Sequence, residues 1–483
     1  MYLALRVTAA LTFLCLAFQI DVAAQDRPPN IVVIYADDLG YGDLGCFGHP
    51  TIRTPNLDRM ANEGMRWTQF YSAACVCTPS RAALMTGRYP IRNGMCSDRR
   101  RVLFPNSGGG IPASEVTLAE ALKKRGYATG CFGKWHLGHL PQFLPTSNGF
   151  DTYFGIPYSN DMDRVASIAP KGRSAFLKPQ SRYWNVPLMR NDKVAERPAD
   201  QTTITKRYTE EAVKFIEANK EKPFFVYLPH SLPHVPLFRS KKFENVSSRG
   251  LFGDVVEEVD WSVGQILSTL KRLKLDSNTI VWFSSDNGPW LIFGDHGGSA
   301  GLLREGKGST WEGGMREPTI AWWPGKIKPG QVTQELGSTM DVYTTSIQLA
   351  GGEVPKDRIV DGVDLRPVLF GTGKSPRETM FYYRGTRLFA VRKGWYKAHF
   401  QTQPGYGGRR PEKHDPPLLF HLGHDPGEQR NIAAKHPEIV AAIQKLAQRH
   451  QSEFKAPPSQ LEIPLRRKGK KKTRRSSSGE PGA

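Results

Sequence analysis

One cysteine in this sequence lies in a setting that packing does not explain. The stretch CVCTPSRAALMTGRYP runs from Cys75 to Pro90, and Cys77 stands two residues before a proline and four before Arg81. A buried structural cysteine behaves as a small hydrophobic residue and requires none of these neighbours. The setting therefore raises the question of a chemical role for Cys77.

Two segments far apart in the sequence end alike. Asp37 and Asp38 follow the apolar run NIVVIY, and Asp286 and Asn287 follow NTIVWF. Three carboxylates and an amide at one edge would repel each other without a cation, and hard oxygen donors favour Ca2+ or Mg2+ over zinc. Asp and Asn before Gly are also common turn formers and helix caps. Spacing alone leaves both interpretations open.

Basic residues and histidines supply the complementary charge. The candidates are Arg81, Lys134, His136, His234 and Lys307. Taken singly, each is more simply explained as surface charge or as a hydrogen-bonded core histidine. Together, a carboxylate-bound divalent metal surrounded by such groups suits the chemistry of an oxyanion ester, because they neutralise charge on the oxygens.

The elements that must position these residues alternate between strands and helices, which predicts an α/β fold. A helix is expected from Pro55 to Gly64, and another from Thr117, with a capping box to Glu120, to Gly126. Polar residues follow the predicted strands, which are 31–35, 127–132, 224–228 and 279–283. Because ligands bind outside the carboxyl ends of the strands in open α/β sheets, these residues should converge on one site.

The motifs resemble the type I, formylglycine-dependent sulfatase family. CTPSRAALMTGR matches its C-x-P-S-R signature, and ADDLGYGDLG, GCFGKWHLG, SSDNGPW, GKGSTWEGGMREP and LFHLGHDPGEQRNIA extend the likeness over residues 29–433. GFDTYFGIPYSND looks closest to arylsulfatase A-like members. The resemblance implies an alkaline phosphatase-like mixed sheet flanked by helices, with a small α+β C-terminal domain.

The resemblance also implies the chemistry. Cys77 would be oxidised to formylglycine (3-oxoalanine) by a formylglycine-generating enzyme, and its hydrated aldehyde would be the nucleophile. One Ca2+ would be bound by Asp37, Asp38, Cys77, Asp286 and Asn287. The roles implied for the other residues are diol support for Arg81 and Lys134, proton acceptance for His136, and sulfate binding for Ser159, His234 and Lys307. His230 lies in the same loop as His234 and is the alternative histidine.

Composition and charge set the wider expectations. Residues 1–24 have the pattern of a signal peptide cut near Ala24, which predicts a periplasmic or secreted protein. The apolar run is short for a membrane anchor, which needs roughly 20 residues, so no transmembrane segment is expected. Residues 25–374 form the predicted catalytic domain and 375–465 the C-terminal domain. Residues 466–483, with eight basic residues between Arg466 and Arg475, read as a disordered tail. Nucleic-acid binding is not expected.

Five cysteines remain after the signal peptide, so at least one is free, modified or shared with another chain. Cys75 is either a spare thiol or a partner of Cys46, Cys96 or Cys131, and the sequence does not decide.

The predicted activity is hydrolysis of a sulfate monoester, on a sulfated poly- or oligosaccharide. The alternatives are a phosphodiester or phosphonate monoester hydrolase of the same superfamily, and an exported binding protein without turnover. We expect selectivity to come from residues 159–205, from the LIFGDHGGSAG loop and from the C-terminal domain.

Overall fold

A computed structural model describes residues 27–406 and 409–465 of the 483-residue chain. The predicted signal peptide, residues 1–24, and the predicted tail, residues 466–483, lie outside the described residues. None of the described helices has both the length and the apolar character that crossing a membrane requires.

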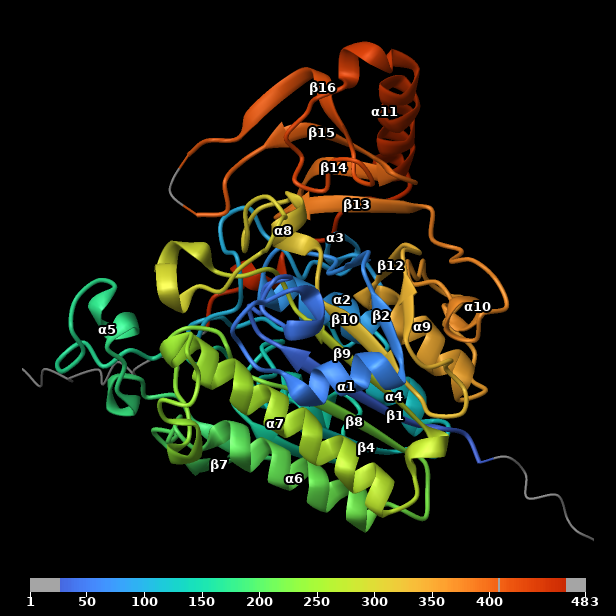
Figure 1. The fold of residues 1–483 in the computed structure, drawn as a ribbon. Helices are drawn as coiled ribbons and strands as arrows, with labels where there is room; N and C mark the ends of the chain where they lie inside the picture. The colour runs from blue at the N-terminus through green and yellow to red at the C-terminus, as the bar shows by residue number, and fades with distance from the viewer. Residues whose placement is uncertain (1–26, 407–408, 466–483) are drawn as a thin grey trace, which may run out of the picture.

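The largest element of the fold is a sheet of ten strands in the order β11-β2-β10-β9-β1-β8-β4-β5-β6-β7 (Figure 1). The bounds are β1 Asn30–Ala36, β2 Met65–Trp67, β4 Ala128–Phe132, β5 Thr152–Gly155, β6 Leu188–Arg190, β7 Lys193–Glu196, β8 Phe224–Pro229, β9 Thr279–Ser285, β10 Thr319–Trp322 and β11 Gln331–Thr333. The central strands from β9 to β5 are parallel, whereas β10 and β6 run antiparallel to their inner neighbours.

Strand β1 shows why the sheet is central. Its seven residues are all buried, and alternate side chains point to opposite faces, as β geometry requires. Val32 and Ile34 join one apolar core, and Ile31 and Val33 join the other. A strand covered on both faces is expected to read as a continuous apolar run, as the NIVVIY segment does.

Helices cover both faces. One face is packed by α1 (Pro55–Glu63), α6 (Ile204–Ala218) and α7 (Gly250–Arg272). The other is packed by α2 (Cys77–Thr86), α4 (Leu118–Lys123) and α9 (Thr339–Leu349). The mixed sheet flanked by helices is therefore confirmed.

Local signals in the sequence set the helix ends closely. Thr117 and Glu120 form the predicted capping box of α4. That helix ends at Lys123, and the turn after it closes at Gly126, whose φ of +82° suits glycine.

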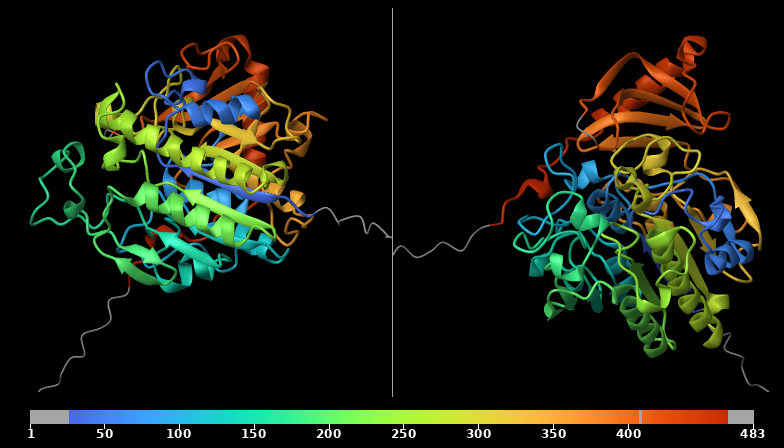
Figure 2. Two further views of the ribbon diagram at one scale, coloured as in Figure 1. Left: turned by 60° about the horizontal axis from the view of Figure 1, so that its bottom comes forward. Right: turned by 60° about the vertical axis from the view of Figure 1, so that its left-hand side comes forward.

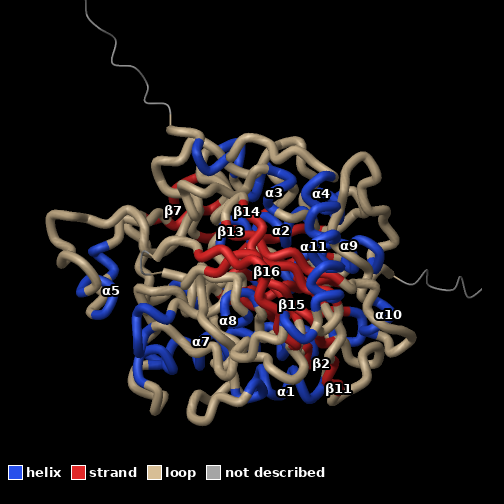
Figure 3. The backbone as a smooth tube through the Cα atoms, turned by 90° about the horizontal axis from the view of Figure 1, so that it is seen from above, coloured by secondary structure: helices blue, strands red, loops and turns tan. Residues whose placement is uncertain are grey.

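A second, antiparallel sheet of four strands lies above the first (Figures 1 and 2). Its strands are β13 Thr379–Arg384, β14 Arg387–Lys393, β15 Tyr396–Thr402 and β16 Glu412–His421, and α11 (Pro437–Ser452) packs on it. Val440, Ile443 and Ala447 of α11 are buried, on the face that the sequence pattern predicted. Seen from above, this small sheet lies across the middle of the molecule (Figure 3).

The remaining described elements are short. They are β3 Phe70–Tyr71, β12 Gly337–Ser338, α3 Pro90–Asn93, α5 Ser174–Leu177, α8 Glu312–Met315 and α10 Arg366–Leu369, together with several 3-10 turns. The region 159–203 is mostly loop, apart from the β6–β7 hairpin, α5 and one 3-10 turn.

After α11 the chain returns to the large domain. The Gln460 amide donates to the Gly94 carbonyl over 2.8 Å, and Leu461 is fully buried in the core of the large domain. Residues 460–465 lie against the segment 94–109, so the end of the described chain contacts the large domain.

Candidate active site

The polar residues after β1 and β9 meet at the carboxyl edge of the large sheet. The two strands are paired in parallel, with Ala36 opposite Ser285, so the residues that follow them are neighbours. The Asp38 amide donates to Asp286 Oδ1 over 3.2 Å, and Asn287 Nδ2 donates to Asp38 Oδ1 over 2.7 Å. These side chains and that of Asp37 are nearly inaccessible to solvent, so water cannot solvate the three carboxylates.

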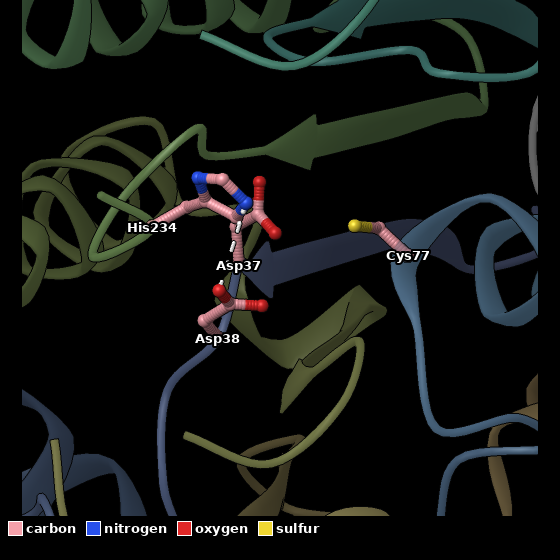
Figure 4. Close-up of side chains that lie close together, drawn as sticks. All are labelled: Asp37, Asp38, Cys77 and His234. Atoms are coloured by element: carbon pink, nitrogen blue, oxygen red, sulfur yellow. Dashed lines mark ion pairs between the residues drawn. The ribbon is translucent and has the colours of Figure 1, made fainter. Parts of the chain in front are cut away.

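Cys77 is the first residue of α2 and is buried. Figure 4 shows its thiol pointing from the opposite wall toward Asp37, Asp38 and His234. One potential ligand atom from each of these four residues lies within 4.8 Å of the others. Burial raises the pKa of the Cys77 thiol to about 12, so the unmodified side chain is a neutral thiol and a poor nucleophile.

Three cations neutralise the carboxylates. Arg81, on α2, forms an ion pair with Asp286 at 2.8 Å. Lys134, after β4, contacts Asp37 and donates to Ser159 Oγ over 3.1 Å. Lys307 donates to Asp38 Oδ1 over 2.7 Å, and its Nζ lies 3.8 Å from Cys77 Sγ.

The balance of burial and charge differs among the carboxylates. Burial favours the neutral form of Asp37, but Lys134 and the other cations hold its pKa below the usual range. Burial raises the pKa of Asp38 to about 6 against the attraction of Lys307. Burial and the charge of Asp37 raise the pKa of Asp286 to about 7. Burial thus disfavours the charged forms of Asp38 and Asp286 although cations lie beside them, and a divalent cation bound among the carboxylates would favour those charged forms.

The two candidate histidines of the loop after β8 are separated by the structure. His234 Nε2 lies 3.6 Å from Asp38 Oδ2, and its Nδ1 bonds the Val235 carbonyl. His230 instead bonds Ser262 Oγ of α7 over 3.2 Å. His234 therefore lies in the site, and His230 lies in the packing between β8 and α7.

His136, after β4, has one free ring nitrogen. Its Nε2 bonds the Leu103 carbonyl over 2.9 Å, which places the proton on Nε2. Nδ1 is buried and has no hydrogen-bond partner among the described residues. Burial and Lys134 hold the pKa of His136 well below its usual value, so this nitrogen is an unprotonated acceptor.

The donor set suits a hard divalent cation. Asp37 Oδ1 and Asn287 Oδ1 are buried with no hydrogen-bond partner in the described chain. Unpaired buried oxygens next to strained carboxylates are what Ca2+ would satisfy. The four residues whose ligand atoms lie together include His234, to which the family resemblance assigns sulfate binding. Asp286, which the resemblance assigns to the metal, forms an ion pair with Arg81.

The segment that carries Lys307 is held from behind by the small sheet. Lys397 Nζ, on β15, lies 2.9 Å from Glu312 Oε1 and donates to the Thr310 carbonyl over 2.9 Å. Glu428 accepts from the Glu312 amide over 2.7 Å and lies 3.1 Å from Lys397. Lys397, Glu312 and Glu428 are completely buried, so this ion-pair network joins the small sheet to the segment that carries Lys307.

A cavity of about 350 Å³ leads to Cys77. Its lining combines predicted and unpredicted residues: Cys77, Arg99, Arg100, Arg101, Val102, Phe104, His136, Ser159, Asp161, Met162, His234, Trp290, Lys307 and Tyr406. The sequence did not single out Asp161, Trp290, Tyr406 or the three arginines, although Asp161 and Tyr406 lie in regions expected to set selectivity. The signals that could have found some of them are the run Arg99–Arg101 and the place of Trp290 as the last residue of the SSDNGPW motif.

Known proteins share this sequence and fold. Residues 29–352 match the family model Sulfatase, and residues 375–473 match the model of the C-terminal region of aryl-sulfatase. Human arylsulfatase A is 44% identical over 448 residues, covering 87% of each chain, and mouse N-acetylgalactosamine-6-sulfatase is 43% identical, covering 91% of this chain and 89% of its own. The crystal structure of PsFucS1 sulfatase from Pseudoalteromonas sp. superposes with a TM-score of 0.79 at 31% identity, covering 90% of this chain and 92% of that one.

Family matches over most of the chain agree with a site that gathers a cysteine, carboxylates, lysines and histidines at one edge of the sheet. The chain therefore belongs to the sulfatase family and is a sulfatase, an enzyme that hydrolyses sulfate esters.

Proposed function

We propose that the protein hydrolyses a sulfate monoester with Cys77 matured to formylglycine and with one Ca2+ held by Asp37, Asp38, residue 77, Asp286 and Asn287. The observation that carries the proposal is the Cys77 side chain, which faces the carboxylates and lies 3.8 Å from Lys307 Nζ. When present, the aldehyde hydrate supplies an attacking oxygen and a second hydroxyl, and Ca2+ polarises the sulfate oxygens.

The residues around position 77 bind and orient the sulfate. Lys307 and His234 lie on the Asp38 side, where they can donate to sulfate oxygens and to the departing alcohol oxygen. On the Asp37 side, Lys134 donates a hydrogen bond to Ser159, and both side chains can bind the sulfate and the group at position 77. Preorganised donors of this kind stabilise negative charge as it moves from sulfur to the leaving oxygen.

His136 is suited to accept a proton near position 77. Thr78 Oγ1 donates to the His136 carbonyl over 3.0 Å, which ties the histidine to the first turn of α2. With Nε2 committed to Leu103, the free Nδ1 is the acceptor that the elimination of sulfate requires.

The substrate that we propose is a sulfated carbohydrate outside the cytoplasm. Mouse N-acetylgalactosamine-6-sulfatase is named for a sulfated sugar, and the cavity size suits a small sugar unit. Export through a signal peptide at residues 1–24, maturation by a formylglycine-generating enzyme and the domains 25–374 and 375–465 belong to the same proposal.

Two measurements on one preparation test it. Protein co-produced with a formylglycine-generating enzyme is digested with trypsin, and the mass of the peptide Trp67–Arg81 is compared with that of the thiol form. Sulfate release is then measured for wild type and Cys77→Ala. We expect a peptide lighter by the thiol-to-aldehyde change, and sulfate release that Cys77→Ala abolishes.

The alternatives give different results. Equal behaviour of wild type and Cys77→Ala would indicate a binding protein. Faster hydrolysis of phosphodiesters or phosphonate monoesters than of sulfate esters by the matured protein would indicate the related hydrolase activity.

A further inference from the structure

The cavity has a charged mouth that the chemistry at its inner end does not use. Cys77 and His136 at the inner end are buried, whereas Arg99 and Arg101 are exposed. The volume of about 350 Å³ lies in the range of small-molecule sites. The reacting sulfate fills only the inner part, so the rest of the cavity must receive the alcohol portion of the substrate.

A continuous wall connects the mouth to the reaction centre. The Arg101 guanidinium lies 4.2 Å from the centre of the Tyr406 ring, and this ring lies 5.0 Å from that of Trp290. Trp290 in turn lies 4.4 Å from Lys307 Nζ and 5.3 Å from the His234 ring. The two aromatic side chains, whose ring planes are tilted by 46° to each other, form an apolar wall against which a sugar ring can pack between Lys307 and Arg101.

The three arginines of the mouth differ in what they contact. The Arg99 side chain is 85% exposed and lies 3.8 Å from Glu462. Arg100 donates to Asn106 Oδ1 over 2.6 Å and to Ser107 Oγ over 3.2 Å. Arg101 is held in place by the Gly405 carbonyl, to which its Nη1 donates over 2.9 Å. Within residues 27–406 and 409–465, no carboxylate lies within 4.0 Å of the charged nitrogens of Arg101.

Arg101 is therefore positioned and has no carboxylate partner. A guanidinium has five donors in a rigid fork, and a single backbone carbonyl uses one of them. An oxyanion can receive two of the remaining donors side by side, which is the strong form of such hydrogen bonds. Asp161 also lines the cavity, with its Oδ1 unpaired among the described residues, and it would repel an anion while accepting hydrogen bonds from hydroxyl groups.

We infer that Arg101, positioned by Gly405 and Tyr406, forms a subsite for a second anionic group on the leaving alcohol, so that the enzyme prefers sulfated sugars that carry another sulfate or a carboxylate. This inference rests on the proposed sulfate ester hydrolysis. It assigns to the β15–β16 hairpin a direct part in choosing the substrate, since Gly405 and Tyr406 lie between those strands.

The test compares substrates that differ only in the second charge. The probes are N-acetylgalactosamine 6-sulfate, its 4,6-disulfate, and the disaccharide in which the 6-sulfated sugar is linked to glucuronic acid; 4-nitrophenyl sulfate reports turnover independently. We expect wild type to show a higher kcat/KM for at least one doubly anionic sugar. In Arg101→Gln this preference falls about tenfold, mainly through KM, because the contact forms on binding.

Controls separate charge from folding. Arg59→Gln, on the exposed face of α1, keeps the wild-type preference. Arg101→Lys keeps the charge without the fork and retains part of the preference. For wild type, we expect the preference for doubly anionic sugars to weaken as salt rises from about 0.05 to about 0.5 M, because salt screens the attraction between Arg101 and the second anionic group. This measurement needs no variant, so it remains informative even if Arg101→Gln does not fold.

The outcomes separate a failure of the Arg101 subsite from a failure of the proposed sulfatase activity. An unchanged preference in Arg101→Gln, no preference in wild type, or hydrolysis of 4-nitrophenyl sulfate with none of the sugars accepted would each overturn the subsite. The loss of preference for the disulfate alone identifies a sulfate subsite, and for the uronate alone a carboxylate subsite. Absence of sulfate release from every probe by formylglycine-containing protein would overturn the proposed function itself.

Discussion

Arg81 and Asp286 form an ion pair in which both side chains are almost completely buried. The guanidinium Nη2 and Nε lie 2.8 and 2.9 Å from the same carboxylate oxygen, and Nη1 donates to the Lys134 carbonyl over 2.8 Å. The pair connects α2 to the end of β9, and thus connects the residue at position 77 to the edge of the sheet that carries the carboxylates.

Removing the cation of this pair should destabilise the unmatured protein. In Arg81→Met, Asp286 loses its buried partner, which costs about 3–5 kcal/mol in the free energy of unfolding at a pH where the carboxylate is charged. Urea denaturation with EGTA present measures it, so that no metal compensates the carboxylate. Arg59→Met on the surface serves as control and should change stability by less than about 0.5 kcal/mol. A loss for Arg81→Met as small as that of the control would contradict the importance of the pair.

Calcium should stabilise the folded protein. Binding to the folded state alone adds about 2.7 kcal/mol at a hundredfold excess over Kd, which raises Tm. Thermal denaturation in EGTA and in Ca2+ measures the shift, and Mg2+ at equal concentration tests selectivity. Asp37→Asn should lose the shift, and Asp295→Asn, an exposed aspartate, should keep it. Equal Tm values with and without Ca2+ in wild type would count against the proposed metal site.

The two histidines after β8 should have separable effects. His234→Gln removes a group 3.6 Å from Asp38 and should lower kcat by about 10²–10⁴. His230→Gln affects the contact with Ser262 and should chiefly lower stability, by about 1–3 kcal/mol. Sulfate release and urea denaturation on both variants distinguish them. If His230→Gln were the variant with the larger loss of kcat, the assignment of His234 would be wrong.

The buried lysine of the small sheet should matter for catalysis at a distance. Lys397→Met leaves Glu312 and Glu428 without their shared cation, which should reduce stability by about 3–5 kcal/mol. Because this network holds the segment that carries Lys307, kcat should also fall in the fraction that remains folded. Activity per folded molecule is measured at 15 °C, with Lys393→Met, at the exposed end of β14, as the matched control. Full activity of folded Lys397→Met would show that the network serves stability alone.

His450 should make the protein less stable in acid. It is 4% exposed, and its ring stacks on Phe381 at 3.6 Å. Burial and nearby Arg92 lower the pKa of His450 to about 4, whereas an unfolded histidine titrates near pH 6.5. Between these values the unfolded state binds a proton that the folded state does not, so stability falls as pH falls from about 6.5 to about 4.

Replacing His450 removes that contribution. The urea midpoint of His450→Phe should change less between pH 7 and pH 5 than that of wild type, whereas His424→Gln, at an exposed position, should follow wild type. An identical pH dependence in wild type and His450→Phe would assign the acid sensitivity to other groups.

The sequence predicted well those features that follow from local pattern and sheet geometry. Strands of buried apolar residues ended within one or two residues of their predicted bounds, and their parallel pairing brought Asp38 and Asp286 together as expected. Only the resemblance to the sulfatase family favours His234 over His230, because both histidines follow the same strand and only tertiary packing turns one toward Ser262.

Other features depend on contacts between distant segments and leave no local signal. Tyr406 reaches the cavity from the small sheet, and Lys397 pairs with a glutamate 85 residues earlier in the chain. Neither residue belongs to a periodic pattern that would mark it. The sequence does not decide the pairing of the cysteines, and in the structure Cys46, Cys75, Cys77, Cys96 and Cys131 are free thiols.

The return of the chain after α11 has a mechanical consequence. Because residues 460–465 bond to the segment 94–109, the small domain is anchored to the large one at both of its ends, like a loop inserted into a rigid frame. A domain attached by a single linker can swing as a hinged flap, whereas one fixed at two points resists rotation about either. Two attachments also restrict the movement of the hairpin that carries Gly405 and Tyr406 relative to the reaction centre. The Tyr406 side of the cavity therefore limits the size of the molecules that can enter.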